Sequence, residues 1–161
     1  MSDGLRQLIK ESIRLELNVS KIYLGFHHRF TEDADFWWKM AIEEESHAAL
    51  LASGEKYFLH SKMFPLELIC TSLDTLADLN RELECLIQSE SKFPSSKSEA
   101  FNLAIRLEKS AGEIHFQHAM RELPQPSEPI KLFRILNNSD MDHADRIRSY
   151  IREKRIDVAA H

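Results

Sequence analysis

The chain has 161 residues, of which 43% are hydrophobic and 29% are charged, and its formal net charge is −5. This length predicts a single domain over residues 1–161, with one sizeable core. The acidic balance argues against nucleic acid as the main partner, because no basic face offsets it. No apolar stretch resembles a signal-peptide core or a transmembrane helix, so we expect a soluble, cytoplasmic protein that does not bind membranes.

Five segments have the apolar periodicity of helices and none has the sustained alternation of a strand, so the sequence predicts an all-α fold. In chain order, the expected helices cover about 3–30, 36–60, 65–91, 98–119 and 127–150. Polar or proline-containing segments separate them. Ser98 and Ser127 are the expected N-caps of the fourth and fifth helices.

Four of these helices carry an acidic residue in the middle of the apolar stripe, and the third helix has none. In two of the four, a histidine follows three residues later on the same helix face. The pattern occurs twice, first as Glu16, Glu44 and His47, and then as Glu108, Asp140 and His143. In each half the predicted turn lies midway between the first acid and the histidine, so an antiparallel helix pair brings these side chains to one level.

A buried carboxylate without a partner costs several kcal/mol or takes up a proton, and four acids at one level repel each other. Two divalent cations would remove both problems. Four carboxylates and two neutral imidazoles form an oxygen-rich ligand set that suits iron or manganese better than structural zinc. The sequence therefore predicts a two-metal site in which carboxylates bridge the ions.

The pattern resembles that of di-iron and di-manganese carboxylate bundles, in which two helices each contribute a Glu and two others each contribute a Glu-x-x-His. Local sequence adds to the resemblance: Tyr23 follows Glu16 by seven residues, EEESHA surrounds His47, and LAIRLEKSAGEIHF surrounds Glu108. Over nearly its whole length the chain is similar to the rubrerythrin-like branch of the ferritin-like superfamily. This resemblance implies a four-helix bundle in which the third expected helix is the crossover between the second and third bundle helices.

The resemblance also implies roles for individual residues. The implied metal ligands are Glu16, Glu44, His47, Glu108, Asp140 and His143. Glu44 and Glu108 are the carboxylates expected to take part in catalysis, and Tyr23 is expected to hydrogen-bond a ligand carboxylate. Asp140 stands where the family has a glutamate, and Ala111 stands where rubrerythrins have a further one, so the site looks closer to the six-ligand kind of bacterioferritins.

For function, the resemblance implies two iron ions, with manganese or mixed metals as alternatives, and reduction of oxygen or hydrogen peroxide. The sequence contains no C-x-x-C pair of a rubredoxin-type iron centre, so we expect the electrons to come from an external electron-transfer protein. A homodimer is also expected. The alternatives are iron handling or storage, meaning ferroxidation without an organic substrate, and a metal-bound bundle with no catalytic role.

Other residues have simpler expected roles. Glu43 lies off the stripes and is expected to be solvated, and Trp37 is expected to pack one end of the bundle. The basic run that begins at Arg146 is expected to complement the dipole of the last helix. Cys70 and Cys85 are both expected inside the third helix, roughly 22 Å apart, which prevents a disulfide between them and fits a reducing compartment.

Overall fold

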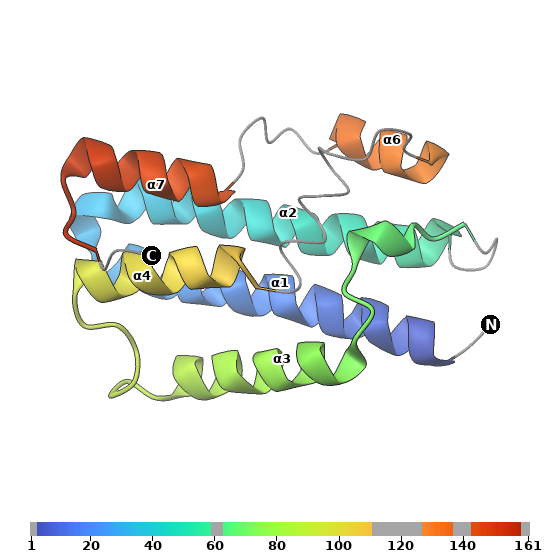
Figure 1. Cartoon of the computed structure of the whole chain (residues 1–161), viewed down its shortest axis with the longest axis horizontal. Coiled ribbons are helices and arrows are strands. Elements are labelled where there is room, and N and C mark those ends of the chain that lie inside the picture. The colour runs from blue at the N-terminus through green and yellow to red at the C-terminus, as the bar shows by residue number, and fades with distance from the viewer. Residues whose placement is uncertain (1–2, 59–62, 111–126, 137–142, 159–161) are drawn as a thin grey trace.

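The computed structural model describes residues 3–58, 63–110, 127–136 and 143–158, and this part of the chain is built from helices (Figure 1). Its elements are α1 (Asp3–Arg29), the 3-10 helix η1 (Thr31–Asp33), α2 (Ala34–Phe58), the 3-10 helix η2 (Leu66–Leu68), α3 (Leu73–Gln88), α4 (Lys97–Glu108), α6 (Glu128–Leu136) and α7 (His143–Lys154). No strand occurs among the described residues, which confirms the predicted all-α class there. None of the described helices is long and apolar enough to span a membrane.

The two long helices α1 and α2 pack against each other as an antiparallel hairpin (Figure 1). The turn between them is short: the N–H of Asp33 donates to the carbonyl of Phe30 at 2.9 Å, and α2 begins at the next residue. α3 lies along α1 and returns the chain to the end of the molecule that holds this turn. α4 begins at that end and packs against α7, which runs in the opposite direction.

The core consists of two apolar clusters. One lies towards the α1–α2 turn and includes the fully buried rings of Phe26, Trp37 and Phe101. The other joins η2 and α6 to the opposite end of the hairpin through side chains such as Leu51 and Phe133. Along α2, the Glu-x-x-His motif lies between the residues of the two clusters, so its polar side chains are enclosed on both sides.

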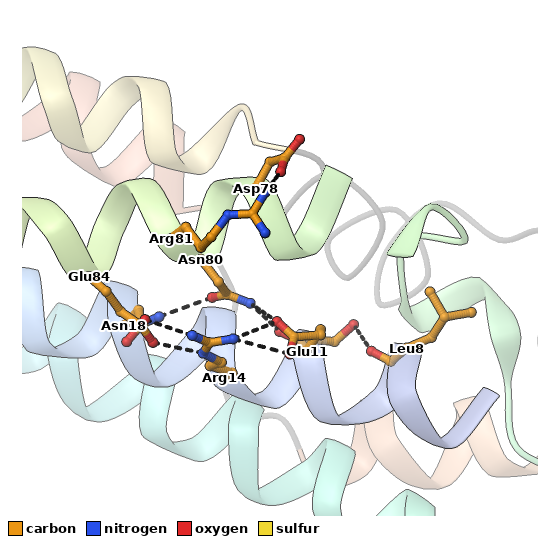
Figure 2. Close-up of polar contacts among 9 residues, drawn as sticks. Leu8, Glu11, Arg14, Asn18, Asp78, Asn80, Arg81 and Glu84 are labelled. Atoms are coloured by element: carbon orange, nitrogen blue, oxygen red, sulfur yellow. Dashed lines mark hydrogen bonds and ion pairs between the residues drawn. The ribbon is translucent and has the colours of Figure 1, made fainter. Parts of the chain in front are cut away.

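A network of polar side chains holds α3 against α1 (Figure 2). Asn80 of α3 is fully buried; it accepts a hydrogen bond from Asn18 at 3.0 Å and donates to the carbonyl of Glu11 at 2.9 Å. Arg14 donates two hydrogen bonds to the carboxylate of Glu84, at 2.7 and 2.6 Å. A sliding of α3 would leave the Asn80 amide buried without partners, so these bonds fix the register of α3 on α1.

The third helix is shorter than the predicted 65–91. Leu66–Leu68 form η2, and Ile69 has the extended backbone angles φ −130° and ψ 149°. Ser72 then caps α3, because its hydroxyl accepts a hydrogen bond from the backbone N–H three residues later. Cys70 therefore precedes α3 instead of lying within it, and the prediction of one continuous helix here was wrong.

The N-terminus of α4 also differs from the prediction. Ser96, and not Ser98, is its N-cap, and it forms a capping box with Glu99. The glutamate reaches back to the N-cap backbone, which adds a second bond that Ser98 could not obtain at its position. α4 ends at Glu108, earlier than expected. Residues from 111 onwards in the expected fourth helix lie outside the described residues.

The expected fifth helix corresponds to two described helices. α6 begins directly after Ser127, the position predicted for the cap, and α7 begins at His143. Residues 137–142 lie outside the described residues, so the prediction of one continuous helix is tested only at its two ends.

Candidate metal centre

The structure brings five of the six predicted ligands together in the middle of the molecule. Glu16 comes from α1, and Glu44 and His47 come from α2. Glu108 is the last residue of α4, and His143 is the first residue of α7. Their side chains face inward because each lies on the apolar stripe of its helix. All five are buried, and the most exposed, Glu108, has an exposed fraction of only 5%. The sixth predicted ligand, Asp140, lies outside the described residues.

Glu44 stands between the two histidines. Its Oε2 is hydrogen-bonded to Nδ1 of His47 at 3.1 Å, and its Oε1 lies 2.8 Å from Nδ1 of His143. Each imidazole also has a second carboxylate: Glu16 Oε2 lies 3.5 Å from His47 Nδ1, and Glu108 Oε2 lies 3.6 Å from His143 Nδ1. The two imidazole rings are nearly parallel, with centroids 5.1 Å apart. The cluster is thus nearly symmetric about Glu44.

The atoms of this cluster are arranged as a metal site would require. Glu44, His47 and His143 each offer one ligand atom, and these atoms lie within 4.8 Å of one another. Glu44 Oε1, Glu108 Oε2 and His143 Nδ1 are buried and form no hydrogen bond to the described residues. The same atoms face one another at 2.8 and 3.6 Å, so buried charges here are close together and costly to desolvate. Cations between these atoms would pair with the carboxylates directly, so the residues fit a bound metal.

Glu43 has a structural role that the sequence analysis missed. Its carboxylate accepts a hydrogen bond from Nε2 of His143 at 2.9 Å and two from Arg146, at 2.6 and 2.5 Å. Nε2 of His143 therefore carries a proton, which leaves Nδ1 to face Glu44 and Glu108. Carboxylates that orient the outer nitrogen of a histidine in this way are typical partners of metal-binding histidines.

The prediction that Glu43 is solvated was therefore wrong, as was the assignment of Arg146 to the helix dipole alone. Glu43 lies off the apolar stripe of α2, but its carboxylate contacts His143 and Arg146 of α7, and its side chain is only 28% exposed. The sequence does contain a signal for this contact: Arg146 follows His143 by three residues on the same helix face and needs an anionic partner opposite it.

Tyr23 lies next to Glu108, one of the carboxylates that the resemblance implies as metal ligands. It is fully buried, and its hydroxyl donates a hydrogen bond of 2.6 Å to Oε1 of Glu108. This bond uses one carboxylate oxygen and leaves Oε2 of Glu108 directed towards His143. Tyr23 thus orients Glu108 from the α1 side.

The carboxylates hold protons on both imidazoles of the metal-free protein. Burial alone would lower the pKa of His47, but hydrogen bonds to Glu16 and Glu44 outweigh it and raise the pKa to about 9. Burial likewise opposes protonation of His143, and Glu44 and Glu108 outweigh it, so its pKa is raised well above the usual value. The site therefore attracts positive charge strongly.

The pKa values of the glutamates are shifted in different directions. Burial would raise the pKa of Glu43, but His143 and Arg146 lower it to about 2, so this carboxylate is ionised at neutral pH. The pKa of Glu44 is lowered as well, because the two histidines outweigh its burial. The pKa of Glu108 is raised, mainly by burial and also by the charge of Glu44.

Comparison with known proteins gives no matching family, no matching curated protein and no matching solved structure. What the site does is therefore inferred from its own residues.

Proposed function

We propose that the chain is a two-metal carboxylate protein of ferritin-like architecture, which binds two iron ions and reduces dioxygen or hydrogen peroxide. One observation carries the proposal: Glu44 presents one carboxylate oxygen to each of two buried histidines. A carboxylate in this position is suited to bridging two ions. Glu16 and His47 would then hold one ion, and Glu108 and His143 would hold the other.

The ligand chemistry supports iron or manganese. Buried carboxylate oxygens and two imidazole nitrogens form a hard, oxygen-rich set without a thiolate, since neither cysteine belongs to the cluster. On the same proposal Asp140 would add a further carboxylate to the ion beside His143. When bound, ferrous iron supplies the electrons for reducing oxygen or peroxide, which the side chains alone do not supply.

The residues of the chain prepare the site for this chemistry. Both imidazoles release protons when they bind cations, because a metal ligand must be the neutral imidazole. Glu43 keeps the outer nitrogen of His143 protonated, and Tyr23 holds Glu108 with one oxygen free for the ion. The two apolar clusters on either side exclude water and keep the electrostatic attraction for cations strong.

The helix arrangement supports the architectural part of the proposal. α3 carries no buried acid, lies along α1, and returns the chain so that α4 starts at the end that holds the α1–α2 turn (Figure 1). This is the place of the crossover in a ferritin-like bundle. We further propose that an external electron-transfer protein supplies the electrons and that the chain forms a homodimer.

The test measures ferrous iron binding and oxidation in three proteins: the parent, Glu44→Gln, and the matched control Glu45→Gln. Glu45 is the exposed neighbour of Glu44 on the same helix. We expect the parent and Glu45→Gln to bind and oxidise two ferrous ions per chain, and Glu44→Gln to lose this activity while its circular dichroism is unchanged. Equal oxidation in all three proteins would reject the proposal.

A second assay separates repeated turnover from iron storage. Decay of hydrogen peroxide is followed on iron-loaded protein with and without an electron donor. We expect the donor to sustain the decay over many equivalents of peroxide. Decay that stops once the bound iron is oxidised, even with the donor present, would indicate iron handling instead of an oxidoreductase.

A further inference from the structure

Beyond the metal ligands, a continuous set of aromatic rings leads from the site towards the surface. Tyr23, bonded to Glu108, stacks on Trp37 with ring centroids 5.6 Å apart. Trp37 contacts Phe101 at 4.5 Å, and Phe101 contacts Tyr150 at 5.8 Å with nearly parallel rings. The rings span the distance from the fully buried Tyr23 to the partly exposed Tyr150.

A second ring provides a parallel connection. Phe36 lies 5.0 Å from Trp37 and stacks on Tyr150 with centroids 4.1 Å apart. Tyr150 borders a surface cavity of about 490 Å³, which Lys39 and Lys154 also line. A soluble molecule in this cavity would reach the Tyr150 ring.

Both tyrosines at the ends of this set donate to a carboxylate. The Tyr150 hydroxyl donates to Oδ1 of Asp33 at 3.0 Å, and the other carboxylate oxygen of Asp33 lies 3.0 Å from Nζ of Lys97. Burial and the bond to Asp33 raise the pKa of Tyr150 to about 12, so the phenol is protonated at neutral pH. A phenol gives up an electron readily only when a base accepts its proton, and each of these tyrosines has such a base.

Packing alone does not explain the choice of residues. Phenylalanine would fill the core at these positions without any hydroxyl to satisfy. The indole N–H of Trp37 is buried and has no hydrogen bond to the described residues, which is a cost that phenylalanine would avoid. Of the rings in the set, the three that lose an electron most easily are the two tyrosines and the tryptophan.

We propose that Tyr23, Trp37 and Tyr150 form an electron path between the buried Glu/His cluster and the surface, with Asp33 as the proton acceptor at the outer end. The physiological role of the path rests on the proposed function: the path would carry electrons from an external one-electron donor to the site.

Reduction of one hydrogen peroxide to two waters takes two electrons and two protons, so the path would act twice for each peroxide, with the two protons taken from solvent. In each passage the oxidised site takes one electron from Tyr23, whose proton passes to Glu108. Tyr150 then loses one electron, which moves through Trp37 to the Tyr23 radical, and the Tyr150 proton passes to Asp33. Tyr23 recovers its proton from Glu108. The result is an oxidised Tyr150 at the surface, which the external donor reduces while Asp33 returns the proton.

The test uses metal-free full-length protein, so it does not depend on iron binding. Ruthenium(III) tris-bipyridine, generated by a light flash with persulfate, oxidises the protein from solution, and electron paramagnetic resonance identifies the tyrosyl radical. The background variant Tyr57→Phe/Trp38→Phe removes the two exposed rings outside the path. It leaves Tyr23, Tyr150 and Trp37, because the chain has three tyrosines and two tryptophans.

In this background we expect a radical at Tyr23, identified by its loss in Tyr23→Phe. Adding Tyr150→Phe or Trp37→Phe should reduce the Tyr23 signal to the level seen in Tyr23→Phe, and Asp33→Asn should lower the yield at Tyr150. Thermal melting checks that each variant is folded. If Trp37→Phe does not fold, the result for Tyr150→Phe alone tests the path.

A Tyr23 radical that persists at full yield in Tyr150→Phe would overturn the path, as would the absence of any Tyr23 radical in the background protein. These outcomes are distinct from failure of the proposed function, which would appear as loss of iron binding or oxidation in the parent protein.

Discussion

Glu43→Gln removes a negative charge from the outer side of His143 while keeping the size of the side chain. In the parent, the carboxylate accepts the Nε2 proton of His143 at 2.9 Å and is ionised at neutral pH, because its pKa is about 2. The amide accepts a weaker hydrogen bond from Nε2 and gives Arg146 no charge to pair with. His143 then becomes a poorer metal ligand and is held less firmly.

Loss of such an outer partner typically weakens metal binding about 10- to 100-fold, or about 1.4–2.7 kcal/mol. The structure predicts that this loss falls on one ion, because Glu43 contacts His143, whereas Glu16 and Glu44 contact His47. Calorimetric titration of metal-free protein with ferrous iron or manganese should therefore show one weakened site and one unchanged site.

Glu45→Gln is the matched control for this titration, since it makes the same change at an exposed position of α2. It should leave both sites unchanged. Equal affinities in Glu43→Gln and the parent would refute the role assigned to Glu43. Equal weakening of both sites would refute the assignment of the two histidines to separate ions.

Three further predictions concern the same cluster. Glu44→Ala should destabilise the metal-free protein by about 1–3 kcal/mol in urea unfolding, because the two histidines lose the carboxylate that they share and keep only their other carboxylate partners; an unchanged or raised midpoint would contradict this. The pKa of His47 is about 9, against 6.5 for a free imidazole, so its contribution to metal-free stability is complete below pH 6.5 and is lost as the pH rises through 9. Metal affinity should change in the opposite sense and rise from pH 6.5 to 9. Calorimetry in buffers of different ionisation enthalpy would measure the protons released on binding. A metal affinity that does not change over this pH range would argue against His47 as a ligand. Finally, Asp140→Glu should tighten the weaker of the two metal sites and Asp140→Asn should weaken it further, as measured by the same titration; no effect of either change would show that Asp140 is not a ligand.

The first helix hairpin could be predicted from the sequence because its determinants are local. A long apolar stripe with helical period specifies each helix, and a short polar segment specifies the turn. Once the turn is placed, the antiparallel geometry determines that Glu16 and His47 lie at one level. The observed separation of 3.5 Å between their side-chain atoms agrees with this reasoning.

The interruption before α3 could not be predicted from periodicity. The apolar stripe continues across residues 65–73, so a pattern with period 3.6 does not reveal the interruption between η2 and α3. What ends the first segment and starts α3 is the competition between helical hydrogen bonds and the side-chain cap of Ser72. The same kind of cap, from Ser96, sets the start of α4.

The role of Glu43 depended on tertiary packing. Its position on α2 is adjacent to the apolar stripe, and whether such a position is solvated depends on which helix packs beside it. Because α7 lies there, Glu43 becomes the partner of His143 and Arg146. An amphipathic pattern predicts the centre of a buried face better than its edges.

The measurement that tests the central claim most directly is a crystal structure of the iron-loaded protein with an anomalous-scattering map at the iron edge. We predict two iron peaks per chain, on either side of the Glu44 carboxylate, with one bound to His47 and Glu16 and the other to His143 and Glu108. Iron peaks that do not contact Glu44, or a map without iron between the two histidines, would contradict the claim.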